Sequence, residues 1–209
     1  MAAGRREAPS ILATDAIRAG RKAMDVTNLC TVRPLPERVI EEIDPALTAL
    51  LKAAESAVRA TVALKLADCS WAPREAVRML AFEPIEIARP ILERSLRLSE
   101  PDLAALVEIG RDQRLSVARR AHVAAPISRA IARKREADCL TVLAGNPGAQ
   151  LPDDCAADFT AAARADADLQ DQLAGRADLS AAFARSLYAV AGETVKRRLL
   201  EAAPELDPG

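Results

Sequence analysis

Aromatic side chains are scarce in this 209-residue sequence, which contains one Trp, one Tyr and three Phe. Half of the residues are nevertheless apolar, and most of these are small or aliphatic. Alanine and leucine favour helices, as do the abundant arginine and glutamate. The sequence therefore predicts an all-α protein with an aliphatic core, in which each helix contact buries less area than an aromatic contact would.

Long uncharged apolar runs are also missing. No window approaches the roughly 18 apolar residues that a membrane-spanning helix needs, and the N-terminal stretch lacks an apolar core of signal-peptide length. Glu7 and Asp15 argue against an organelle transit peptide. We therefore expect a cytoplasmic protein without a membrane span.

Metal-binding and catalytic patterns are absent from the sequence. Cys30, Cys69, Cys139 and Cys155 form no CxxC pair and suit small buried hydrophobes, and the lone His122 excludes a site with several histidines. We expect no metal, no cofactor and no catalytic residue, hence a protein that is not an enzyme. The alternative is a helical-repeat glycosylase or lyase with Trp71 and a carboxylate in one cleft.

Two acidic or glycine-rich stretches have a structural interpretation. Asp154 and Asp158 lie four residues apart near a helix start and could weakly hold a divalent cation, but helix capping explains them better. The turn GNPG at 145–148 has no GK[ST] after it and no strand before it, so it predicts a helix stop and not a phosphate loop.

One phrase recurs along the chain. It reads LERSLRLS at 92–99, VARRAHVA at 117–124 and LAGRADLS at 173–180. Helix-start signals follow each occurrence, as in Ser99 with Asp102 three residues later, and a shorter apolar helix precedes each one. Five apolar anchors thereby lie 25 to 28 residues apart: Trp71, Leu98, Val123, Leu151 and Leu179.

A unit of this length predicts a helical hairpin, which buries both faces only when hairpins stack. We therefore expect an α-solenoid of about five short HEAT-like hairpins at 61–203, with an N-terminal helical cap at 1–60 and a tail at 204–209. Trp71 is expected in the core between the cap and the first repeat. The last helix is expected to run from Ala181 to about Ala203.

The strings LADCSWAPREAVRMLAFEPIEIARPILERSLRLSEPDLAAL, SVARRAHVAAPISRAI and LAGNPGAQL carry a family resemblance. Together they resemble the mostly alphaproteobacterial family known as domain of unknown function 2336 (DUF2336), over Leu66 to Leu179. The resemblance implies a HEAT-like or leucine-rich-variant helical repeat fold. It implies no activity and supplies no catalytic motif.

Charge is distributed unevenly. Residues 61–135 contain 14 basic and 9 acidic residues, whereas 136–209 contain 6 and 13. A basic middle region suits DNA or RNA, which we keep as the alternative partner. The near-neutral total charge and the few aromatics disfavour nucleic acid and indicate solvated faces or salt bridges to the acidic last third.

Arginines recur in the turns before the anchors. Because arginine grips carboxylates with two hydrogen bonds, we expect a non-enzymatic scaffold or adaptor that binds an acidic protein segment in bacterial signalling or regulation. A second copy of the chain, as in a homodimer, is another candidate partner. The competing interpretation is that these arginines only cap helix C-termini. The expected partner-binding residues are Arg94, Arg119, Arg120, His122 and Arg176.

Overall fold

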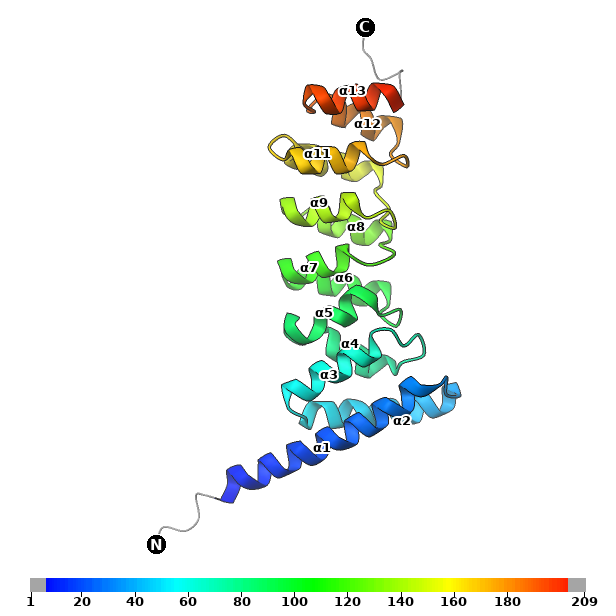
Figure 1. The fold of residues 1–209 in the computed structure, drawn as a ribbon, viewed down its shortest axis with the longest axis vertical. Helices are drawn as coiled ribbons and strands as arrows, with labels where there is room; N and C mark the ends of the chain where they lie inside the picture. The colour runs from blue at the N-terminus through cyan, green and yellow to red at the C-terminus, as the bar shows by residue number, and fades with distance from the viewer. Residues whose placement is uncertain (1–6, 203–209) are drawn as a thin grey trace. The chain divides into compact units, whose positions relative to one another are not determined.

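The protein is all-helical, as the sequence predicted (Figure 1). The computed structural model describes residues 7–202, with side chains from Thr14 to Glu201, and no β-strand occurs among them. The expected tail at 204–209 lies outside the described residues. The elements are α1 (Glu7–Val32), α2 (Glu37–Ala53), α3 (Ser56–Leu66), α4 (Arg74–Ala81), α5 (Ile85–Arg94), α6 (Glu100–Ile109), α7 (Arg111–Ala118), α8 (Ala125–Ala132), α9 (Ala137–Gly145), the 3-10 helix η1 (Asp153–Cys155), α10 (Ala156–Ala163), α11 (Ala167–Ala174), α12 (Ala181–Tyr188) and α13 (Glu193–Ala202).

The chain forms two compact units, Met1–Asp102 and Leu103–Gly209, and the boundary falls within α6. The sequence prediction divided the chain instead by the type of helix, at residues 60 and 203. The predicted boundaries separate helices that carry the repeated phrase from helices that lack it, and they stay a prediction.

In the first unit, long helices begin the chain. The 26-residue α1 packs on α2 and α3, after which α3 contacts α5 and α2 contacts α4. Trp71 joins these parts, because its indole Nε1 donates a hydrogen bond of 2.7 Å to the backbone oxygen of Cys30 in α1. Trp71 contacts α1 as expected from the sequence, but its side chain is half-buried and does not belong to the core.

In the second unit, the helices form two layers. Helices α7, α9, α11 and α13 contact one another in succession, while α8 contacts η1 and α10 contacts α12. Figure 1 shows these short helices as successive pairs. The first helices of successive pairs, α7, α9, α11 and α13, therefore pack on one another in chain order.

The five anchors lie in the turns between the two helices of a pair. Leu98 and Val123 are buried, and Trp71, Leu151 and Leu179 are half-buried. Four of the five helix pairs that flank an anchor are in contact, namely α3 with α4, α7 with α8, α9 with α10 and α11 with α12. The start of α6 also has the expected cap, since Ser99 Oγ accepts from the backbone N–H of Asp102 while Asp102 Oδ2 accepts from that of Ser99.

The expected single helix from Ala181 to about Ala203 is wrong. The chain forms α12 and α13 with a break after Tyr188, and α13 packs back on α12 and α11. Gly192, which is a poor helix former, lies in the break, and its N–H donates to Gln170 Oε1 at 2.9 Å. This bond replaces a helical one and fixes the turn.

The core is aliphatic, as the composition predicted. Most of its members are Ala, Leu, Ile and Val, and the four cysteines are all free and buried. Phe159 and Phe183 are the exceptions, and their ring centroids lie 5.8 Å apart. Among residues 7–202, no helix combines the length and apolar character that a membrane span requires.

Candidate interaction surface at the hairpin turns

The five residues expected to bind a partner differ in exposure. Arg94 belongs to the first unit, and Arg119, Arg120, His122 and Arg176 belong to the second. Arg94, Arg119 and His122 are exposed, whereas Arg120 is buried and the Arg176 side chain is only 6% exposed. Burial removes Arg120 and Arg176 from the exposed edge on which the sequence prediction placed them.

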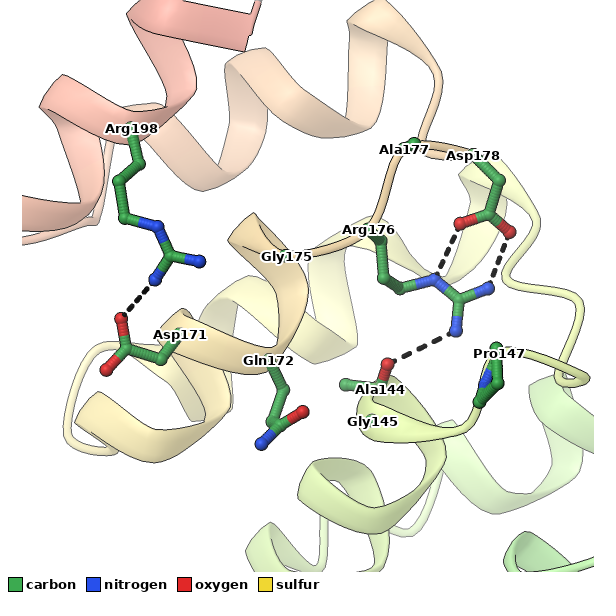
Figure 2. A pocket seen from close by; sticks show the side chains of 10 residues that line it. All are labelled: Ala144, Gly145, Pro147, Asp171, Gln172, Gly175, Arg176, Ala177, Asp178 and Arg198. Carbon is green, nitrogen blue, oxygen red and sulfur yellow. Dashed lines mark hydrogen bonds and ion pairs between the residues drawn. The ribbon is translucent and has the colours of Figure 1, made fainter.

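Arg176 uses its whole guanidinium inside the protein (Figure 2). Nη1 donates to the backbone oxygens of Ala144 and Asn146 at 3.2 and 2.7 Å, and Nη2 donates to that of Ala149 at 2.7 Å. Nε and Nη2 also bind the Asp178 carboxylate at 2.8 and 2.5 Å. The acceptors lie at or just after the end of α9, so Arg176 caps the preceding hairpin, as the competing interpretation held.

Neighbouring turns are joined in the same manner elsewhere. Asn146 Nδ2 donates to the backbone oxygens of Ala118 and Arg120 at 2.8 and 2.7 Å, across 28 and 26 residues. In the first unit, Arg97 Nε donates to the oxygen of Ala72 at 2.9 Å, across 25 residues. In each case, one polar side chain of a turn thus forms hydrogen bonds to the backbone of the turn before it.

Backbone contact also joins two turns of the second unit. Val123 and Ala149 form an isolated parallel β-bridge, with Val123 N donating to Gly148 O at 3.0 Å and Gln150 N donating to Val123 O at 2.9 Å. A Cβ atom at residue 148 would collide with the backbone oxygen of Ala121. Gly148, the second glycine of the GNPG turn, therefore allows the two turns to approach closely. Helix α9 ends at the first glycine, Gly145, as predicted.

Arg120 and Arg94 differ in their surroundings, since Arg120 is buried and Arg94 forms an exposed ion pair. Burial lowers the pKa of Arg120, since the charged guanidinium has little contact with water. Arg94 Nε lies 2.8 Å from Asp68 Oδ1, in an ion pair that spans 26 residues. Among the predicted residues, Arg119 and His122 are thus the exposed side chains of the second unit.

In the second unit, a groove beside Arg176 is lined by residues of α9, α11 and α13 (Figure 2). It has a volume of 710 Å³, and Arg198 on one wall pairs with Asp171 at 2.9 Å. Two arginines and two aspartates line it, and both arginines bind the aspartates. The groove therefore carries no excess charge that would attract an ion.

Seven of the 14 basic side chains in residues 61–135 pair with acidic side chains about one repeat away. The partners are separated by 22 to 27 residues, which agrees with the repeat length and brings equivalent positions of neighbouring hairpins together. The sequence prediction of salt bridges to the acidic last third is confirmed for four arginines, Arg111, Arg114, Arg129 and Arg135. The pairs are Arg78 with Asp102, Arg94 with Asp68, Arg111 with Asp138, Arg114 with Glu136, Arg129 with Asp154, Lys134 with Glu108 and Arg135 with Asp158.

Asp154 and Asp158 face cations of the protein. Arg129 Nε lies 2.6 Å from Asp154 Oδ2, and Arg135 Nε lies 2.7 Å from Asp158 Oδ1. Their carboxylates therefore serve ion pairs between hairpins. In the part of the chain with described side chains, no group of three potential metal ligands comes together.

Sequence reasoning missed one buried carboxylate, Asp44 of α2. Its Oδ2 accepts from Glu75 N at 2.8 Å and its Oδ1 from Ala76 N at 2.9 Å, so it caps the start of α4. Capping residues are usually sought next to the helix that they cap, and Asp44 precedes Glu75 by 31 residues. Its position inside an apolar stripe of α2 was the available signal.

The family described as an uncharacterised protein conserved in bacteria (DUF2336) matches residues 87–208, which begins later and ends later than the expected range. No curated protein matches the chain, and no solved structure matches it. Because the match covers more than half of the sequence, the chain belongs to the DUF2336 family of bacterial proteins.

Proposed function

We propose that the protein is a non-enzymatic scaffold, built as an α-solenoid of HEAT-like hairpins, that binds an acidic segment of a partner protein in bacterial signalling or regulation. The supporting observation is a set of ion pairs between neighbouring hairpins, in each of which an arginine of one hairpin binds an aspartate of the next. Stacked hairpins of this kind offer an extended surface for recognition. The exposed turn residues Arg119 and His122 are the contact points proposed on that surface.

The nucleic-acid alternative receives less support. Phosphate binding needs cations that can release counterions from the backbone. Arg111, Arg129 and Arg135 already lie within 2.7 Å of carboxylate oxygens of the same chain. Their pairing leaves the basic middle region with less charge for phosphate than its sequence indicates.

An affinity purification from the native bacterium, followed by chemical cross-linking, tests the proposed function. We compare the wild type with Arg119→Glu and with Arg197→Glu, an exposed arginine of α13 that serves as the matched control. We expect Arg119→Glu to lose partners that the wild type and the control retain. Their cross-linked peptides should be rich in Asp and Glu.

Identical partners for all three folded proteins would contradict the role of the turn. Cross-links confined to basic segments would contradict the acidic partner. Arg120 is left unchanged, because a carboxylate at this buried position would unfold the protein and confuse the result.

A further inference from the structure

The first and last helices differ in the chemistry of their exposed side chains. In α13, every exposed side chain up to Glu201 is polar or charged. In α1, Ile17, Leu29 and Val32 are 53%, 52% and 81% exposed, and they are three of the seven large apolar side chains exposed among the described residues. A stack of helical hairpins needs end helices with a polar outer face to remain soluble by itself. Helix α13 meets this requirement, and α1 does not.

The outward face of α1 also carries two opposite charges. Ala23 is completely buried, so the side of the helix opposite to it faces outward. Arg21 and Asp25, two residues before and two after Ala23, lie near that outward line because an α-helix turns by about 100° per residue. Both are exposed, and the ion pair within this helix joins Arg18 to Asp15 instead, at 3.7 Å. An arginine four residues before an aspartate is the less favourable order for a pair within one helix.

A groove lies beside these two charges, between α1 and the start of α3. Its volume is 390 Å³, and its lining includes the apolar side chains of Ile17 and Met24. Arg21, Asp25 and Glu55 supply it with one positive and two negative charges. The surface next to Asp25 is therefore recessed and favours an arginine of a second molecule.

The order of the side chains along α1 fits a second α1 that runs in the opposite direction. A two-fold axis level with Ala23 would place Arg21 of one copy beside Asp25 of the other, and this pair would occur twice. Ile17 and Leu29 would lie level with each other, at the two edges of the contact. Two parallel helices in register would instead bring like charges together, which is unfavourable. The charges therefore select an antiparallel second copy.

We propose that α1 is the contact of a homodimer, in which two α1 helices pack antiparallel about an axis level with Ala23. Arg21 of each copy binds Asp25 of the other, and Ile17 and Leu29 lose contact with water. The dimer is a weak one, because a single helix pair buries less than the roughly 1,200–2,000 Å² of a standard interface. This inference goes beyond the proposed function, since the turn residues proposed there do not belong to α1.

Exchanging the two charges gives a direct test. Sedimentation equilibrium of the full chain, up to about 1 mM, measures self-association. Arg21→Glu and Asp25→Arg should each weaken the dimer by about tenfold or more, because each creates two contacts between like charges. An equimolar mixture of the two variants should form dimers again, since every contact in the mixed pair joins opposite charges. The double variant Arg21→Glu/Asp25→Arg should associate as the wild type does.

The controls separate this contact from general effects on charge and folding. Arg197→Glu on α13 reverses an exposed charge elsewhere and should leave the dimer unchanged. Ile17→Ser should weaken the dimer, whereas Leu96→Ser, at a position that is 76% exposed, should not. Circular dichroism checks that all variants fold.

A wild type that stays monomeric at about 1 mM, or a mixture of the two charge variants that stays monomeric, would overturn this inference. Dimers that survive Arg21→Glu but dissociate in Arg119→Glu would place the contact at the turns and overturn it as well. If the wild type is monomeric and Arg21→Glu loses a protein captured from the native bacterium, α1 binds that protein and not a second copy.

Discussion

Arg114 and Glu136 form a two-point ion pair across 22 residues. Arg114 Nε donates to Glu136 Oε2 at 2.6 Å and Nη2 to Oε1 at 2.5 Å, while Nη1 donates to the backbone oxygen of Val107 at 2.7 Å. The Arg114 side chain is only 9% exposed. This clamp joins the start of α9 to α7 and to the end of α6.

Removing the charge of Glu136 should destabilise the protein in a pH-dependent manner. Hydrogen bonding by Arg114 lowers the pKa of Glu136 below its usual value of 4.5, so its stabilisation is complete above that pH and is lost as the pH falls through the lowered pKa. We expect Glu136→Gln to cost about 1.5–3 kcal/mol at neutral pH. Urea unfolding at several pH values measures this, and the difference from wild type should shrink in acid.

Glu86→Gln, an exposed change on α5, is the control and should cost nothing measurable. If the difference in unfolding free energy between wild type and Glu136→Gln stayed constant down to acid pH, the charge of Glu136 would not be the source of the stabilisation.

Asp44→Ala should destabilise α4 from a distance. The carboxylate accepts two backbone N–H groups at the start of this helix, and they would have no acceptor without it. We expect a loss of about 1–2 kcal/mol, the range of helix-cap removal. Chemical denaturation followed by Trp71 fluorescence measures it, and Glu41→Ala on the exposed face of α2 is the comparison. Equal midpoints for the two variants would refute the cap.

Arg176→Lys should behave almost as badly as Arg176→Ala. A lysine keeps the charge but cannot reach Asn146 O and Ala149 O together with the fork of a guanidinium. We expect about 1.5–3 kcal/mol of destabilisation from lost bonds to a charged group. Arg185→Lys, exposed on α12, provides the control in thermal unfolding. A stable Arg176→Lys protein would show that charge alone suffices.

Gly148→Ala tests the close approach of two turns. The new Cβ would overlap the backbone oxygen of Ala121 and push apart the bridge between Val123 and Ala149. Such overpacking should cost about 1–3 kcal/mol. At Gly175 the nearest atoms lie 3.5 Å from an added Cβ, so Gly175→Ala should be tolerated. Hydrogen exchange of the Gln150 amide, which bonds to Val123, should increase in the first variant alone.

The buried thiols should resist modification in the folded protein. Burial raises the pKa of Cys30 and of Cys155 to about 11 and that of Cys139 to about 12, so almost no thiolate exists near neutral pH. A chromogenic thiol reagent should react with all four cysteines only after urea unfolding. Ser186→Cys, exposed on α12, should add one thiol that reacts at once. Rapid modification of the native wild type would contradict this burial.

The repeated phrase was sufficient to predict the hairpins, since each anchor marks a turn that local signals such as Ser99 and Asp102 also define. The break before Gly192 was missed because apolar spacing continues through it, and only the bond to Gln170 reveals the turn. Asp44 was missed because its target helix is remote in sequence. At Arg176, composition left open whether the side chain binds a partner or a helix end, and only its neighbours in space decide.

The charge pairs between hairpins also bear on how such a chain can change in length. Arg111, Arg129 and Arg135 each reach a carboxylate of the following hairpin and none farther along. A duplicated hairpin would thus contain both the arginines and the carboxylates of these pairs. It could form the same ion pairs with the hairpin before it and with the hairpin after it. The gain or loss of a whole repeat is consequently an easier change for this protein than the insertion of a few residues within one.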